Sequence, residues 1–127
     1  MSDVPIDLAT AFSTLDEAWS PRLVATLNGQ HVRIAKLRGA FTWHAHEEED
    51  ELFLVHAGQL AIEREGPEGA LPTIELGPGQ LYVVPRGMRH RPVTRTEEVQ
   101  VLLFEPASTI NTGDADDPRR QDAPPSL

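Results

Sequence analysis

Short apolar runs separated by Gly- and Pro-rich turns make up the chain between residues 21 and 105. We count about nine such runs at regular spacing, which is typical of an all-β sandwich or barrel. Asn28-Gly29 stands between the first two runs and is a strong signal for a β-hairpin. No segment of useful length after Pro21 has apolar residues at helical spacing. The pattern therefore predicts a small antiparallel β-domain.

The two ends of the chain depart from this pattern. Before residue 21, apolar side chains recur at roughly helical spacing, namely Ile6, Leu8, Phe12, Leu15 and Trp19. They predict a short helical segment that covers one end of a sheet rather than doing chemistry. From residue 106 the composition becomes polar and Pro-rich, which is typical of a surface arm or a disordered tail. The expected division is a covering segment (1–20), a β-barrel (21–105) and an arm or tail (106–127).

A strand is expected over residues 41–44, and it ends in His44, with His46 two positions further on. The next expected strand begins with the carboxylate of Glu51. In extended backbone His44 and His46 share a face, and Glu51 shares a face with Phe53 on the next strand. Two imidazoles and a carboxylate on facing strands can reach one point, which outlines a site for a first-row transition metal ion. His90 follows another strand and a Pro-Gly turn. The alternative is that these are unrelated core or surface side chains.

Two blocks of the sequence resemble, in order and spacing, the paired motifs of the cupin superfamily. The residues that carry the resemblance are His44, His46, Glu51 and Gly58 in the first block and Gly79, Pro85, Gly87 and His90 in the second. Gly39 lies one residue nearer the first histidine than the usual pattern, and Thr94 stands where asparagine is usual. The chain is most similar to small single-domain cupins of the bacterial type.

This resemblance implies an all-β, antiparallel jelly-roll barrel with a short N-terminal helical segment and an irregular C-terminal tail. It also implies one divalent metal ion per subunit, bound by His44, His46, Glu51 and His90. The chain has no cysteine, so Fe, Mn, Ni, Co, Cu and Zn are all admissible. Three imidazoles and one carboxylate leave one or two positions open on such an ion, as in a catalytic or ligand-binding centre.

Cupins include dioxygenases, isomerases, decarboxylases, cyclases and non-catalytic binders, so the fold does not select the reaction. Our leading interpretation is a metal-dependent enzyme acting on a small oxygenated molecule, with dioxygenase-, isomerase- or cyclase-like chemistry. The alternatives are a non-catalytic module that binds or senses a small molecule, and a metal-free structural accessory domain. The sequence has no motif for nucleophilic hydrolysis or nucleotide binding. Glu51 is the only carboxylate expected to point inward, which disfavours a two-carboxylate glycosidase.

The substrate pocket is expected to contain Phe53, which shares the face of Glu51, together with Leu81 and Val83. Arg91 is a further candidate, because an arginine beside the metal can hold a substrate carboxylate. Its alternative role, shared with the other arginines near His90, is an ion pair at the rim. Phe41 is expected on the face opposite His44.

Charge and composition narrow the partners. The net charge of −9 and the isoelectric point of about 4.9 argue against nucleic acid. No apolar run is long enough to cross a bilayer and the first residues show no signal pattern, so a cytoplasmic protein without membrane contact is expected. Leu52 and Leu54 are expected on an outer face of the sheet, where apolar side chains call for a partner or a cover. We therefore expect a homodimer, with coverage by the N-terminal segment as the alternative.

Overall fold

The computed structural model describes residues 3–127 and contains one helix and eight strands over this range. In chain order they are α1 (Leu8–Ser13), β1 (Arg22–Leu27), β2 (Gln30–Leu37), β3 (Glu51–Ala57), β4 (Leu60–Gly66), β5 (Gly69–Leu76), β6 (Leu81–Val84), β7 (Arg89–Thr94) and β8 (Val99–Pro106). The strand expected at residues 41–44 does not form. That segment instead touches β7 through two isolated bridges, Ala40 to Val93 and His44 to His90.

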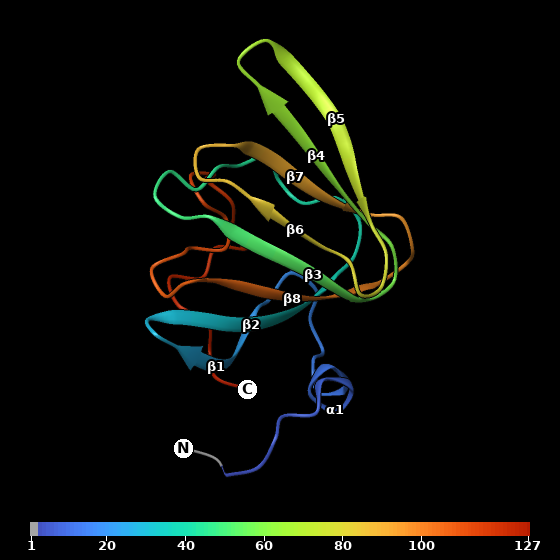
Figure 1. Cartoon of the computed structure of the whole chain (residues 1–127), viewed down its shortest axis with the longest axis vertical. Helices are drawn as coiled ribbons and strands as arrows, with labels where there is room; N and C mark the ends of the chain where they lie inside the picture. The colour runs from blue at the N-terminus through green and yellow to red at the C-terminus, as the bar shows by residue number, and fades with distance from the viewer. Residues whose placement is uncertain (1–2) are drawn as a thin grey trace.

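The strands form two antiparallel sheets that face each other (Figure 1). One has the order β1-β2-β8-β3-β6 and the other the order β5-β4-β7. The core lies between them, where Val55 and Val101 of the larger sheet meet Leu60 and Ile62 of the smaller one. The predicted all-β jelly roll is confirmed, although in the described residues hydrogen bonds do not close the two sheets into one barrel.

Alternation along the strands decides which side chains enter the space between the sheets. On β3, Glu51, Phe53 and Val55 are buried, whereas the residues between them are half-buried on the outer face. The pairing of Glu51 with Val84 and of Phe53 with Tyr82 fixes the register of β6 against β3. Because side chains in a strand alternate with a period of two, this register brings Glu51 to the interior.

The predicted N-terminal helix is present as α1 and covers part of the outer face of the larger sheet. Asp7 caps it, since its Oδ2 accepts a hydrogen bond from the Thr10 amide at 2.9 Å. Phe12 of α1 is fully buried against Ile34 of β2, with Leu102 of β8 packed alongside. Burial of a phenylalanine side chain contributes about 2–3 kcal/mol to folding, which is enough to hold so short a helix in place.

The residues after β8 lie along the domain without helix or strand. Arg33 donates to the Thr109 carbonyl at 2.8 Å, the Asp114 amide donates to the Ala45 carbonyl at 3.0 Å, and the Leu23 amide donates to the Pro125 carbonyl at 2.8 Å. The C-terminal residues are thus fixed at several points along the domain. Over residues 3–127, no helix has the length and apolar character that crossing a membrane requires.

Candidate metal centre

A short antiparallel bridge sets His44 beside His90. The His44 amide donates to the His90 carbonyl at 3.0 Å, and the His90 amide donates to the His44 carbonyl at 2.9 Å. The two imidazole centroids consequently lie 4.3 Å apart. Gly87, with a φ of +80° in the Pro85–Met88 turn, donates its amide to the His46 carbonyl at 2.8 Å and so holds the third imidazole nearby.

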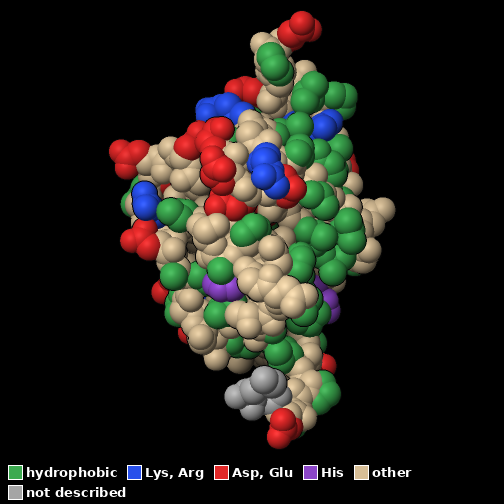
Figure 2. Space-filling view, turned by 60° about the vertical axis from the view of Figure 1, so that its left-hand side comes forward, with side chains coloured by type: hydrophobic (Ala, Val, Ile, Leu, Met, Phe, Trp, Pro, Cys, Tyr) green, Lys and Arg blue, Asp and Glu red, His purple; other side chains and the backbone are tan. Residues whose placement is uncertain are grey.

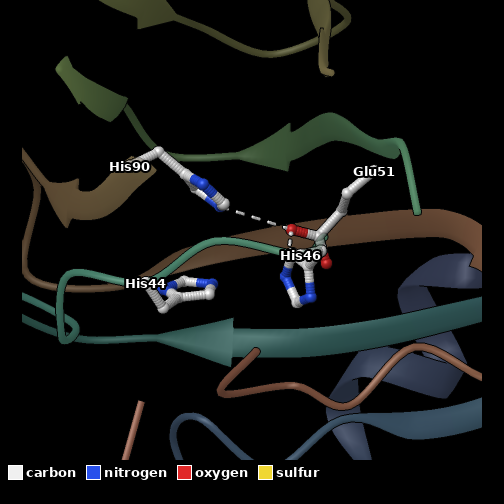
Figure 3. Close-up of side chains that lie close together, drawn as sticks. All are labelled: His44, His46, Glu51 and His90. Carbon is white, nitrogen blue, oxygen red and sulfur yellow. Dashed lines mark ion pairs between the residues drawn. The ribbon is translucent and has the colours of Figure 1, made fainter. Parts of the chain in front are cut away.

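The three imidazoles and the Glu51 carboxylate turn toward one common point (Figure 3). One potential ligand atom from each of His44, His46, Glu51 and His90 lies within 4.8 Å of the others. All four side chains are buried, and little histidine surface is visible on the face drawn in Figure 2. The Nε2 atoms of His46 and His90 lie 3.5 and 3.6 Å from Glu51 Oε1.

The hydrogen bonds around this cluster leave the inward nitrogens free. His44 Nδ1 lies 2.9 Å from the Thr42 carbonyl and His90 Nδ1 lies 2.9 Å from the Met88 carbonyl. A carbonyl only accepts, so each Nδ1 carries the proton and each Nε2 presents a lone pair to the interior. The Nε2 atoms of His46 and His90 are buried without a hydrogen-bond partner. Buried nitrogens without partners, facing a carboxylate, fit a divalent metal ion.

The protonation states also suit a metal. Burial, and then the proximity of His90, lowers the pKa of His44 to about 4, so this imidazole is neutral at pH 7. Burial alone would raise the pKa of Glu51, but the neighbouring Glu105 carboxyl and the imidazoles of His46 and His90 hold it well below its usual value. Burial would lower the pKa of His46, but the proximity and negative charge of Glu51 outweigh it and raise that pKa. The ionised Glu51 carboxylate and the neutral His44 imidazole are the forms in which these side chains bind a metal ion.

The expectation that Glu51 is the only inward carboxylate is wrong. Glu105 of β8 is 1% exposed and lies against Glu51. Burial, and then the charge of Glu51, raises the pKa of Glu105 well above its usual value. Arg33 of β2, also 1% exposed, donates to Glu105 Oε1 at 3.1 Å. The sequence does contain a signal for Glu105. Side chains alternate along β8, so Val101, Leu103 and Glu105 share the inward face.

A cavity runs from this cluster toward the N-terminal segment. A water-sized molecule can move over about 40 Å³ inside it, and His44 and Glu51 are among the residues that line it. Phe53, expected in the pocket, lines this cavity. Phe41 lines it too, with its ring edge-on to His44 at 5.4 Å between centroids, so the expectation that it faces away from His44 is wrong. The reason is that residues 41–46 are not a regular strand and their side chains do not alternate.

Three other residues expected in the pocket lie outside it. Leu81 and Val83 are 56% and 44% exposed, because Tyr82 and Val84 take the inward positions on β6. The strand β6 forms where the sequence predicts it, but the prediction turned the wrong face of this strand inward. Arg91 follows the buried His90 on β7 and so points outward, where its Nη2 lies 2.6 Å from Glu63 Oε1 and its guanidinium packs on Trp43. Basic side chains lie beside acidic ones on the face shown in Figure 2, in keeping with the rim-pair alternative.

Trp19 and Asn111 complete the cavity and were not expected there. Trp19 was assigned to the covering segment and Asn111 to the tail. No local pattern marks either residue as part of a pocket, since both reach it only when the two ends of the chain fold against the sheets.

Comparison with known proteins identifies the family of this fold and cluster. A model described as a cupin domain matches residues 30–105. An uncharacterized protein, YdbB, of Bacillus subtilis strain 168 is 34% identical over 68 residues, which are 54% of this chain and 57% of that protein. The chain therefore spans little more than half the length of this curated relative.

Solved structures agree with the family match. A cupin-2 domain containing protein from Shewanella frigidimarina is 35% identical, with a TM-score of 0.73 over 80% of this chain and 93% of that one. Hydroquinone 1,2-dioxygenase from Sphingomonas sp. TTNP3, in complex with 4-nitrophenol, has a TM-score of 0.71 at 15% identity, covering 80% of this chain and 32% of that one. The second likeness is one of fold alone. The family model and the Shewanella structure both cover most of the strand-forming chain, and the protein belongs to the cupin domain family.

Proposed function

We propose that this protein is a metal-dependent enzyme that acts on a small oxygenated molecule, with one divalent transition metal ion bound by His44, His46, Glu51 and His90. The observation that carries the proposal is the convergence of these four buried side chains, two of which, His44 and Glu51, line a cavity that opens to solvent. A structural metal site has no such approach. The bound ion would supply a Lewis acid that orients and polarises an oxygen of the substrate.

The protein's own residues prepare the site. The Thr42 and Met88 carbonyls fix the orientation of two imidazoles, and the buried Glu105 carboxyl lies beside the Glu51 carboxylate. Apolar walls that include Phe41 and Phe53 keep water from the inner end, which strengthens electrostatic interactions there. These features fit dioxygenase-, isomerase- or cyclase-like chemistry without distinguishing among them.

The second candidate function is non-catalytic binding or sensing of a small molecule, and one observation favours it. Among the described residues that line the cavity, Asn111 is the only polar side chain besides His44 and Glu51. Its amide is already occupied, since Nδ2 donates to the Arg119 carbonyl at 2.9 Å and Oδ1 accepts from the Gln121 amide at 2.7 Å. Proton transfer would therefore fall to a metal ligand, whereas a binder needs no such group.

Metal loading followed by turnover assays separates the candidates. The protein, purified without chelator and loaded in turn with each divalent ion, is assayed for oxygen uptake and substrate loss with a panel of small phenols and diketones. The proposal predicts turnover by wild type with at least one metal and none by His46→Gln, while His56→Gln, at an exposed histidine, behaves as wild type. Tight ligand retention without turnover would establish the binder. A melting temperature unmoved by every ion would leave the metal-free accessory domain, since a bound metal stabilises the native state.

We also propose that the protein forms a homodimer through the outer face of β3 and β6. Leu52 pairs with Val83, and Leu54 pairs with Leu81, so four apolar side chains adjoin on this face. Leu81 and Val83 are both more than two-fifths exposed. The helix α1 covers a different part of the sheet, around Ile34 and Leu102. An uncovered apolar area of this kind is typical of a protein–protein contact.

A further inference from the structure

Trp19 lines the cavity although it comes from the N-terminal segment. It precedes the residues matched by the cupin model, yet its ring lines the cavity. The ring stacks on Phe41 with centroids 4.6 Å apart and planes 18° from parallel. Two flat side chains, one supplied by the N-terminal segment and one by residues 38–50, thus form a continuous wall.

The backbone of Trp19 is held in a conformation that a bulky residue rarely adopts. Its φ is +59°, in the left-handed region that favours glycine. Two hydrogen bonds fix it there: its amide donates to the Lys36 carbonyl at 2.8 Å, and its indole Nε1 donates to the Arg38 carbonyl at 2.8 Å. Strained residues that the surroundings hold in place concentrate at ligand-contacting positions. Here the strain aims a large flat ring into the cavity.

The C-terminal residues contribute Arg119 beside these two rings. The guanidinium of Arg119 lies 4.4 Å from the Phe41 ring and 5.9 Å from the Trp19 ring. Its charge is already paired, because Nε and Nη2 contact the two carboxylate oxygens of Asp117 at 2.9 and 2.8 Å. Asn111 likewise directs its side-chain amide to the Arg119 carbonyl and the Gln121 amide. Away from His44 and Glu51, the described residues that line the cavity are therefore apolar except for Asn111.

We infer that Trp19 determines ligand specificity, selecting molecules that carry oxygen donors at one end and a flat apolar body at the other. The oxygens would face His44 and Glu51, and the flat body would lie along Trp19, Phe41 and Phe53. A ligand with polar groups around its whole surface, such as a sugar, would lose hydrogen bonds to water on entry and regain none at this wall. The inference rests on the proposed metal site and goes beyond it by naming the ligand class and the residue that selects it.

The test uses Zn²⁺-loaded protein, free of oxygen, and two probes that share a metal-binding end. Catechol has two adjacent oxygens on a flat apolar ring, and glycolate has two adjacent oxygen groups without a ring. Calorimetric titrations compare wild type, Trp19→Leu and Trp43→Leu. Trp43 is the matched control, since it packs under Arg89 and Arg91 and does not line the cavity.

We expect Trp19→Leu to weaken catechol binding about tenfold, because the ring-on-ring contact is lost. Glycolate binding and Zn²⁺ affinity should stay within about twofold of wild type, since neither depends on the outer wall. Trp43→Leu should leave all three affinities unchanged. In Trp43→Phe, where Trp19 is the sole tryptophan, catechol should change the emission and glycolate should not. This fluorescence measurement does not require Trp19→Leu to fold.

Several results would overturn the inference. The first is that wild type and Trp19→Leu bind catechol with equal affinity. The second is that Trp19→Leu loses glycolate and catechol binding equally. The third is that catechol leaves the Trp19 emission of Trp43→Phe unchanged. Failure of wild type to bind Zn²⁺ would instead overturn the proposed function, so the two failures are distinguishable.

Discussion

Glu51 lies at the centre of three kinds of contact: the imidazoles of His46 and His90 in front of it, Glu105 behind it, and the cavity beside it. Burying a carboxylate is costly unless partners stabilise its charge. The neighbouring imidazoles and the Glu105 carboxyl do so. The site therefore keeps its negative charge, which a divalent ion needs, at a depth where a lone carboxylate would become neutral.

The acid response of the metal-free protein should report on His44. Its pKa is lowered from 6.5 to about 4, so between these values the unfolded chain takes up a proton that the folded chain does not. Stability therefore falls as the pH falls through this window, and for His44 alone the loss reaches about 3 kcal/mol. The raised pKa of His46 acts in the opposite sense, since its contribution is present at low pH and is lost as the pH rises.

Denaturant unfolding of the metal-free protein between pH 7 and pH 4 tests this expectation. We expect His44→Gln to lose less stability across this range than wild type, because both proteins retain His46 and differ only in the His44 proton. Identical slopes would contradict the lowered pKa.

Removal of Glu105 should destabilise the protein, because it leaves the buried Arg33 without its carboxyl partner. We expect Glu105→Ala to lower the free energy of unfolding by about 3 kcal/mol and Glu105→Gln by about 1 kcal/mol, since glutamine keeps an acceptor for Arg33. Chemical denaturation without metal provides the measurement. A Glu105→Ala protein as stable as wild type would show that the buried pair has no structural role.

At the scale of elements, alternation and turn signals account for most of the predictable structure. The hairpin at Asn28-Gly29 forms between β1 and β2, and alternation on β3 correctly turns Glu51 and Phe53 inward. The same alternation along β8 places the Glu105 side chain inward. The faces of β6 were misassigned because a uniformly apolar run does not reveal its inward side, which only the pairing with β3 determines. Residues 41–46 could not be predicted because long-range bridges set their path.

The contact between the C-terminal residues and the metal ligands depends on Gly113. A Cβ atom at this position would meet the Ala45 carbonyl oxygen and lie 2.9 Å from His44 Cδ2, and the φ is +55°. Gly79 is a matched control, since its φ is +81° but a Cβ there would meet nothing within 4 Å. Both alanine variants incur the cost of left-handed backbone, about 1 kcal/mol, but only Gly113→Ala pushes on His44.

We expect Gly113→Ala to weaken metal binding about tenfold while Gly79→Ala leaves it unchanged, as measured by competition with a chromophoric chelator. Equal metal affinities in the two variants would show that the C-terminal segment does not support the site.

At the scale of the whole molecule, the two chain ends complete a pocket that the strands alone leave open. Trp19 comes from one end and Asn111 from the other, and both lie outside the matched cupin segment. The family motifs thus predict the metal ligands, whereas the shape of the cavity depends on the packing of segments that carry no motif. This is why the sequence predicts the four clustered side chains but only part of the pocket wall.

The proposed dimer gives a prediction at this scale. Light scattering after size exclusion should give twice the chain mass of 14.0 kDa. Leu81→Glu combined with Val83→Glu should give the monomer mass, because two charges would then lie in the apolar contact. Leu71→Glu, at an exposed position on β5, should leave the dimer intact. A monomeric wild type would contradict the proposal.

The central claim is that His44, His46, Glu51 and His90 bind one metal ion together. Equilibrium dialysis against Co²⁺, followed by elemental analysis, measures this stoichiometry directly. We predict one ion per chain in wild type and in His56→Gln, and near-complete loss in His46→Gln and His90→Gln. Wild type that retains no Co²⁺, or a His90→Gln protein that retains as much as wild type, would contradict the account.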